Sequence, residues 1–123
     1  MIKVYVAGNY SADNVIDVLK NIGKGEKTCS ELFYDGFAPF CCWHDASYAK
    51  EACYAEIDKD RFYKASITWL KVSDCMYVIS GKGKGGGVDA EINIAEDLHI
   101  PIFYNYTDLY KWSLKQYALL EGI

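Results

Sequence analysis

The sequence predicts an α/β fold in which a mostly parallel sheet of four or five strands lies between two layers of helices. Short apolar runs typical of buried strands alternate along the chain with longer segments of helical periodicity. Because parallel strands must be joined by crossover connections, this alternation favours a parallel sheet with helices on both faces. The 123 residues, 51% of them hydrophobic, suffice for one core, so we expect a single domain over residues 1–123.

Four segments have the composition of strands. Residues 2–7 are rich in β-forming side chains and end at a glycine, and residues 38–42 form a second run. Residues 75–80 and 100–104 are short and almost continuously apolar, which is typical of strands buried on both faces.

The first helix is expected directly after the first strand. Ser11 or Asp13 is suited to cap it, and apolar residues then recur at the i, i+3, i+4 and i+7 positions of one helix face. These residues are Val15, Val18, Leu19 and Ile22. We expect the glycines of residues 23–25 to interrupt this helix, and a second piece over residues 28–34 to end at Gly36.

Further helices are expected between the later strands. Residues 60–72 should place one apolar face against the sheet, made of Phe62, Ala65, Trp69 and Leu70. Residues 88–99 follow a glycine-rich tract, and Thr107 is expected to cap a last helix that runs to residue 121. Residues 45–56 fit either a mobile helix or a lid.

Composition excludes several classes of protein. The net charge of −4 disfavours a general nucleic-acid binder, which would carry a basic face. No apolar run is long enough to span a bilayer, and the N-terminus has no signal-peptide pattern. The five cysteines form an odd set without Cys-x-x-Cys spacing, so we expect reduced thiols and neither a disulfide framework nor a zinc site. We therefore expect a cytoplasmic protein with no nucleic-acid or membrane partner.

The fold class alone predicts where a ligand binds. In open parallel sheets the site lies at the carboxyl ends of the strands. Those ends bring together residues 8–11, the residues after Cys42, the glycine tract of residues 81–87 and the segment after Tyr104. Free N–H groups at the start of the helix after the glycine tract suit an anion, with Lys82 or Lys84 nearby.

Each of these features also has a purely structural interpretation. The tyrosines of the first strand fit packing, the glycine tract fits a flexible turn, and Glu91 fits an acidic residue favoured near a helix start. The glycine tract matches neither G-x-G-x-x-G nor the P-loop pattern.

Five short motifs follow one another along the chain in a characteristic order. They are residues 5–11 (YVAGNYS), 36–40 (GFAPF), 69–74 (WLKVSD), 85–91 (GGGVDAE, with Ala95 after it) and 100–104 (IPIFY). Together they resemble the nucleoside 2-deoxyribosyltransferase superfamily, which includes the 2'-deoxynucleoside 5'-phosphate N-hydrolases. The resemblance covers residues 1–105 and rests on the order of the motifs more than on any single one.

The resemblance implies a fold and a set of roles. The fold is a flavodoxin/Rossmann-like three-layer sandwich, and members form homodimers or larger homo-oligomers. The spacing from Gly87 to Glu91 matches the family segment whose glutamate attacks the sugar anomeric carbon, and Tyr5 corresponds to the tyrosine that assists it. Asp74 corresponds to an aspartate that positions structure.

Two positions depart from the family pattern. Ser66 stands where relatives carry a pocket aspartate, and Gly85 stands where the hydrolases carry a phosphate-binding serine. The aspartate that protonates the leaving base or orients the sugar is therefore missing or supplied elsewhere, by Asp45 or Asp89. His44 is a further candidate for the acid.

We therefore expect an N-glycosidase or deoxyribosyltransferase that cleaves the N-glycosidic bond of a 2'-deoxynucleoside or its 5'-monophosphate, without a cofactor or metal. The expected catalytic residues are Glu91, Tyr5 and Asp89, and the expected substrate-binding residues are Gly8, Asn9, Tyr10, Ser11, Trp43, His44, Ser66, Gly85, Gly86 and Gly87. Two alternatives stay open: a nucleotide or nucleotide-sugar binding protein without turnover, and an NAD-type ribosyl hydrolase.

Overall fold

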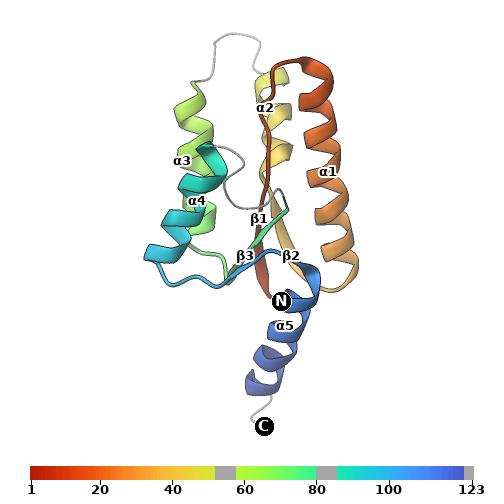
Figure 1. The fold of residues 1–123 in the computed structure, drawn as a ribbon, viewed down its shortest axis with the longest axis vertical. Coiled ribbons are helices and arrows are strands. Elements are labelled where there is room, and N and C mark those ends of the chain that lie inside the picture. The colour runs from red at the N-terminus through yellow and green to blue at the C-terminus, as the bar shows by residue number, and fades with distance from the viewer. Residues whose placement is uncertain (52–57, 80–85, 121–123) are drawn as a thin grey trace.

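The computed structural model describes residues 1–51, 58–79 and 86–120. Within these ranges, four strands and six helical segments follow one another (Figure 1). In order they are β1 (Lys3–Ala7), α1 (Val15–Tyr34), β2 (Ala38–Cys41), the 3-10 helix η1 (Cys42–Asp45), α2 (Ala46–Glu51), α3 (Lys59–Leu70), β3 (Cys75–Val78), α4 (Gly86–Asp97), β4 (Ile102–Phe103) and α5 (Tyr106–Leu120). Residues 81–85 of the glycine tract and residues 52–56 of the expected lid lie outside the described ranges.

The four strands form one sheet in the order β2-β1-β3-β4, and every pairing is parallel. The chain moves outward from β1 to β2, then crosses β1 to reach β3 and continues to β4. The direction of winding therefore reverses at β1, and the crevice beside it, at the carboxyl ends of β1 and β3, is where such sheets bind ligands. The α/β prediction is confirmed.

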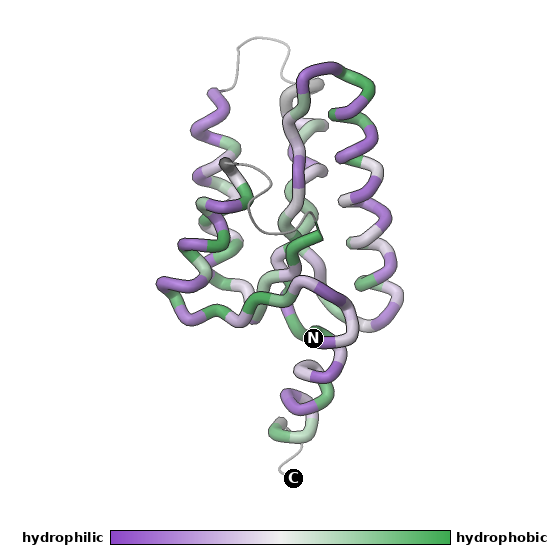
Figure 2. Tube along the Cα trace, viewed as in Figure 1, coloured by the Kyte–Doolittle hydropathy of each residue, from purple (hydrophilic) through white to green (hydrophobic). Residues whose placement is uncertain are grey.

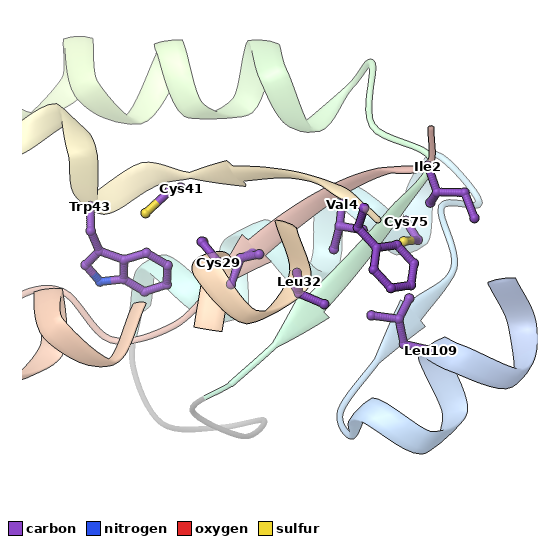
Figure 3. Close-up of a cluster of buried hydrophobic side chains, with 10 residues drawn as sticks. Ile2, Val4, Cys29, Leu32, Cys41, Trp43, Cys75 and Leu109 are labelled. Atoms are coloured by element: carbon purple, nitrogen blue, oxygen red, sulfur yellow. The ribbon is translucent and has the colours of Figure 1, made fainter. Parts of the chain in front are cut away.

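Successive side chains of β1 point to opposite faces of the sheet, and this divides the core into two layers. Val4 and Val6 face a cluster that also contains residues of α1 and α5, which Figure 3 shows in part. Tyr5 and Ala7 face the opposite cluster, which contains residues of α3 and α4. Figure 1 shows the same division, with α1 on one side of the strands and α3 and α4 on the other. The three-layer arrangement thus follows from a central strand that is apolar on both faces.

The expected break in the first helix is wrong. Helix α1 runs without interruption through Gly23 and Gly25. A Cβ at Gly25 would lie 2.2 Å from the indole Cδ2 of Trp43, whereas a Cβ at Gly23 would meet nothing within 4 Å. Gly25 therefore admits a buried ring that packs on the helix backbone, and this tertiary contact compensates for the low helix propensity of glycine.

The helix caps also differ from the sequence prediction. Asn14, and neither Ser11 nor Asp13, caps α1, because its side-chain oxygen accepts a 2.9 Å hydrogen bond from the Asp17 amide. Asn105 makes the same bond to the Asp108 amide at the start of α5, where Thr107 was the predicted cap. These neighbouring polar side chains are chemically similar, and only the backbone conformation selects among them.

The end of α1 is confirmed at Gly36, which has a φ of +97°. The Gly36 amide bonds to the Phe33 carbonyl and the Phe37 amide bonds to the Leu32 carbonyl, which is the Schellman pattern. Helix α4 ends in the same pattern, with His99 at the left-handed position and a φ of 58°.

Two predicted helix faces are partly wrong. Val15 and Leu19 of α1 are exposed, because this end of the helix extends beyond the sheet (Figure 1). On α3 the buried residues are Ser66, Ile67 and Leu70, while Trp69 is 56% exposed. Figure 2 shows polar and apolar residues alternating along both helices, as expected of helices that cover a sheet with one face. Within the described ranges, no helix combines the length and apolar character needed to cross a membrane.

Candidate active site

A cavity of about 580 Å³ lies at the carboxyl ends of β1 and β3, and we call it the switch-point cavity. Four segments form its wall: the loop after β1, the start of η1 and α2, the first half of α3, and the first half of α4. The lining residues are Gly8, Asn9, Tyr10, Ser11, Cys42, Asp45, Ala46, Lys59, Phe62, Tyr63, Ser66, Gly87, Val88 and Glu91. Its size is within the range of cavities that bind small molecules.

Glu91 is the acidic residue that α4 brings to this cavity. Val88 and Ile92 on the same helix are buried against the sheet, and this packing sets the rotation that directs Glu91 to the cavity wall. Burial raises the pKa of its carboxyl from 4.5 to about 7, and a hydrogen-bonding interaction with Tyr5 opposes that rise. Glu91 can therefore exist in either protonation state near neutral pH.

Tyr5 is the buried neighbour of Glu91. Its side chain is fully buried on the face of β1 that contacts α3 and α4. Its hydroxyl oxygen completes no hydrogen bond of full geometry, although Glu91 and Ser66 both lie close enough to act on its proton. Burial and the Glu91 carboxyl raise the pKa of Tyr5, so the phenol keeps its proton and is a donor.

Asp45 and Tyr10 form a second polar pair at the cavity. The Tyr10 hydroxyl lies close enough to the Asp45 carboxyl to act on its pKa as a hydrogen-bond donor, and the pair links the loop after β1 to the end of η1. Burial raises the pKa of Asp45 and the bond from Tyr10 lowers it, with burial the larger effect. The cavity therefore contains two partly desolvated carboxyls, on α4 and on η1, a pattern typical of acid–base sites.

The sequence analysis missed the wall that α3 contributes. Lys59, Phe62 and Tyr63 line the cavity together with the expected Ser66. Their spacing of three, four and seven residues is that of one helix face, and this signal was available in the sequence. It was assigned to core packing because Phe62 is apolar. Lys59 adds a cation to a cavity that otherwise contains two acids.

Several expected site residues lie elsewhere. Trp43 is only 1% exposed and packs in the core, with its indole N–H donating a 3.0 Å hydrogen bond to the Asn9 carbonyl. It therefore holds the cavity loop in place and has no free ring face for a base. His44 is exposed, and its Nε2 lies 3.5 Å from Oε2 of Glu26. It does not line the switch-point cavity.

Gly87 is the residue at the start of α4 that lines the cavity, among the four expected there. Gly87 lines the cavity, whereas Asp89 does not, because residues two apart on a helix point to different sides. Gly86 is the first residue of α4. Gly85 and the two lysines of the glycine tract lie outside the described residues, so an anion site there stays a prediction.

A second hollow, also of about 580 Å³, adjoins the first along the outer edge of the sheet, and we call it the β2-edge groove. It lies between α1 and α3 and shares Cys42, Asp45, Phe62 and Ser66 with the switch-point cavity. Its base includes Phe40, whose ring stacks on Tyr5 at 5.3 Å and on Trp69 at 5.8 Å between centroids. A continuous row of three rings thus connects the buried Tyr5 to the surface.

Asp74 directly precedes β3 and lies at the amino ends of the strands, at the other end of the sheet from the switch-point cavity. Its Oδ2 accepts a 2.8 Å bond from the Lys3 amide and lies 3.4 Å from the Lys3 ammonium. These contacts fix the start of β3 beside β1. Among the described residues, no group of three or more His, Cys, Asp or Glu side chains is arranged to hold a metal ion.

Comparison with known proteins supports the fold. A 2-deoxyribosyltransferase from Bacillus psychrosaccharolyticus matches with a TM-score of 0.55 and 19% identity, over 81% of this chain and 69% of its own. A conserved protein from Enterococcus faecalis V583 matches with a TM-score of 0.54 and 19% identity, over 83% of this chain and 61% of its own. This chain therefore spans about two thirds of the length of the structures it matches.

Sequence comparison adds no relative. No family model matches the chain, and no curated protein matches it. The structural likeness confirms the fold that the sequence motifs implied, and one of the two neighbours is a 2-deoxyribosyltransferase, the activity that names the resembled superfamily.

Proposed function

We propose that this protein cleaves the N-glycosidic bond of a 2'-deoxynucleoside or its 5'-monophosphate, with Glu91 as the nucleophile. The observation that carries the proposal is the Glu91 carboxyl at the wall of the switch-point cavity, beside the buried hydroxyl of Tyr5. The likeness to a 2-deoxyribosyltransferase supports the choice of substrate class.

Glu91 has the properties that a glycosyl nucleophile needs. Its ionised carboxylate attacks C1' of the sugar as the bond from C1' to the base nitrogen breaks, giving a glycosyl-enzyme ester. The absence of a 2'-hydroxyl makes the oxocarbenium-like transition state easier to reach, and the negative charge of Glu91 stabilises it. Tyr5 supports Glu91 by donating its proton toward the carboxylate, which keeps the carboxylate in place and favours its ionised form.

Asp45 is the acid in this proposal. The leaving base takes up the electron pair of the broken bond and needs a proton at its nitrogen. Asp45 lines the cavity and its pKa is raised by burial, so it retains a proton more readily than an exposed aspartate. It replaces Asp89 and His44 as the preferred candidate because neither of those lines the cavity.

The second half of the reaction returns the enzyme to its starting state. Water, or the nitrogen of a second base, attacks C1' and displaces the Glu91 carboxylate, and the proton of the attacking group passes to Asp45. Water gives hydrolysis and a second base gives transfer. Lys59 at the cavity wall is suited to a 5'-phosphate.

The test is a panel of deoxynucleosides and their 5'-monophosphates, with free base followed by chromatography. Wild-type protein should release base from at least one member, and Glu91→Gln should lose on the order of 10³-fold in rate. Glu96→Gln, on the exposed side of the same helix, is the matched control and should keep full activity. Equal release by wild type and Glu91→Gln would defeat the proposal.

Two companion variants test the other roles. Asp45→Asn should slow release of poor leaving bases more than that of good ones, because protonation matters most for a poor leaving group. Lys59→Ala should weaken binding of the monophosphate and leave binding of the free nucleoside unchanged. Thermal stabilisation by a nucleotide without any base release would instead favour the binding-protein alternative, and release of nicotinamide from NAD would favour the ribosyl hydrolase.

Homo-oligomer formation is part of the same proposal. Val15, Ile16 and Leu19 form an exposed apolar strip at the start of α1, and such strips are often covered by a second subunit. Sedimentation velocity at several protein concentrations should give a mass above 13.9 kDa. A monomer at every concentration would contradict it.

A further inference from the structure

We propose that Cys29 and Cys41 form a thiol–disulfide site, in which low-molecular-weight disulfides oxidise the two thiols to a reversible cross-link between α1 and β2. This site is separate from the proposed glycosidic chemistry and does not depend on it. The residues come from different elements, and both are free thiols in the structure.

The two side chains face each other across the layer between α1 and the sheet. Cys29 is buried on α1 and Cys41 is buried at the end of β2, and both belong to the same core cluster (Figure 3). Each thiol lies near enough to the other to be the largest influence on the other's pKa. Two sulfurs that already interact need little backbone movement to reach bonding geometry.

A reagent can approach the pair through the β2-edge groove. Cys29 and Cys41 both line this groove, whose volume of about 580 Å³ exceeds that of a small thiol compound. The other described cysteines are placed differently. Cys75 is fully buried in β3. Burial, together with the nearby Glu91 and Asp45 carboxyls, raises the pKa of the Cys42 thiol.

The surroundings give the two thiols different roles. The interaction with the Cys29 thiol, the nearby His44 and the amides of Trp43 and His44 lower the pKa of Cys41, and they outweigh its burial. The non-covalent interaction with the Cys41 thiol, together with burial, raises the pKa of Cys29. Cys41 is therefore the attacking thiolate and Cys29 the thiol that resolves the intermediate.

The reaction balances in two exchanges. The Cys41 thiolate attacks one sulfur of the disulfide reagent, forms a mixed disulfide and releases the first reagent thiol as its thiolate. The Cys29 thiol then loses its proton and attacks the Cys41 sulfur, forming the Cys29–Cys41 bond and expelling the second thiolate. The protons of the two cysteines end on the two reagent thiols, and the reagent is reduced as the pair is oxidised.

The experiment treats the folded, full-length chain with glutathione disulfide and then blocks the remaining thiols with an alkylating agent. Trypsin leaves Cys29, Cys41 and Cys42 in one peptide, residues 28–50, and cleavage after Glu31 separates Cys29 from the other two. The expected product is a pair of fragments joined through Cys29 and Cys41, lighter than the reduced pair by the mass of two hydrogens and separated by dithiothreitol.

Three serine variants assign the roles. Cys42→Ser should leave the cross-link unchanged and is the matched control. Cys29→Ser should accumulate the glutathione adduct on Cys41, because no thiol resolves it. Cys41→Ser should lose both the cross-link and the adduct at this site.

Three results would overturn the inference. The first is a wild-type chain that stays fully reduced under conditions that oxidise a dithiol peptide. The second is a cross-link that disappears in Cys42→Ser. The third is a Cys29→Ser variant that forms no glutathione adduct. Unfolding curves of each variant keep these results separate from misfolding, since a folded variant retains the wild-type transition. Base release is not needed as a readout.

Discussion

The indole ring of Trp43 lies directly against the backbone of α1 at Gly25, where a Cβ would come within 2.2–2.6 Å of three ring atoms. The same indole donates its N–H to the carbonyl of Asn9 at 3.0 Å. One buried side chain thus fixes α1, the loop after β1 and η1 relative to one another. The last two of these carry Tyr10 and Asp45, so the shape of the cavity depends on this contact.

Gly25→Ala should destabilise the protein, because the new methyl group overlaps a ring that is itself buried and cannot move away. We expect a loss of roughly 1–3 kcal/mol in the free energy of unfolding. Gly23→Ala on the same helix meets nothing within 4 Å and should gain up to about 1 kcal/mol from helix propensity. Urea denaturation of the two variants measures both, and equal effects would contradict the packing assignment.

Glu91→Gln should raise stability at alkaline pH. The Glu91 pKa is raised from 4.5 to about 7 by folding, so between these values the folded state binds more protons than the unfolded state. Stability from this group therefore falls as pH rises through that window. The glutamine variant has no such loss, and its advantage should reach roughly 2–3 kcal/mol at pH 8 and vanish near pH 4.5.

Thermal melts of both proteins across this pH range test the sign. Glu96→Gln replaces an exposed carboxyl on the same helix, so its melting temperature should follow that of wild type at every pH. A Glu91→Gln advantage that is the same at acid and alkaline pH would show that the gain does not come from ionisation.

Base release should depend on pH through the ionisation of Glu91. The nucleophile must be charged, so the acid limb of kcat/KM should rise with pH through about 7, where the free enzyme loses the Glu91 proton. The acid Asp45 must keep its proton, so kcat/KM should fall on the alkaline side as Asp45 ionises. A profile that is flat between pH 5 and pH 8 would place the nucleophile elsewhere.

Tyr5→Phe should distinguish a role of the Tyr5 hydroxyl in positioning Glu91 from a role in the stability of the fold. The Tyr5 hydroxyl is buried without a well-formed partner, so its removal should leave the free energy of unfolding unchanged or raise it slightly. Activity should fall on the order of 10- to 100-fold. Because Tyr5 lowers the Glu91 pKa, the rising limb of the pH profile should move to higher pH, a shift that a purely structural role would not cause.

His99→Gly should stabilise the end of α4. His99 occupies a left-handed position with a φ of 58°, where a side chain costs about 1 kcal/mol relative to glycine. His99→Ala keeps the Cβ and should show no gain, which makes it the control. Chemical denaturation distinguishes the two, and a gain with alanine would point to the imidazole instead of the backbone.

The strands and the place of the site were predictable from local pattern. Residues 2–7 were predicted as a strand from their β-forming side chains, and Glu91 lines the cavity because it follows β3 in an α/β chain. The predictions that were wrong concern features that depend on contacts between residues distant in sequence. Gly25 looked like a helix break, and only the ring of Trp43 explains why it is not.

The errors at the site have the same origin. Trp43 and His44 follow β2 directly, as ligand-binding residues do, but the turn of η1 directs the first into the core and the second to solvent. Lys59 was missed because the helix face that it shares with Phe62 was interpreted as a core-packing face. Its place at the cavity follows from the antiparallel course of α3 along the sheet.

The row of rings from Tyr5 through Phe40 to Trp69 has a practical consequence. Trp69 is the outermost ring and is 56% exposed, whereas Trp43 is buried. Trp69 therefore fluoresces from an indole that is in contact with water. Two ring contacts, through Phe40, connect this indole to Tyr5, the buried neighbour of Glu91. Phe40 lines the β2-edge groove, which adjoins the cavity, so a molecule that shifts Phe40 on binding would change this emission and tryptophan fluorescence would follow its binding.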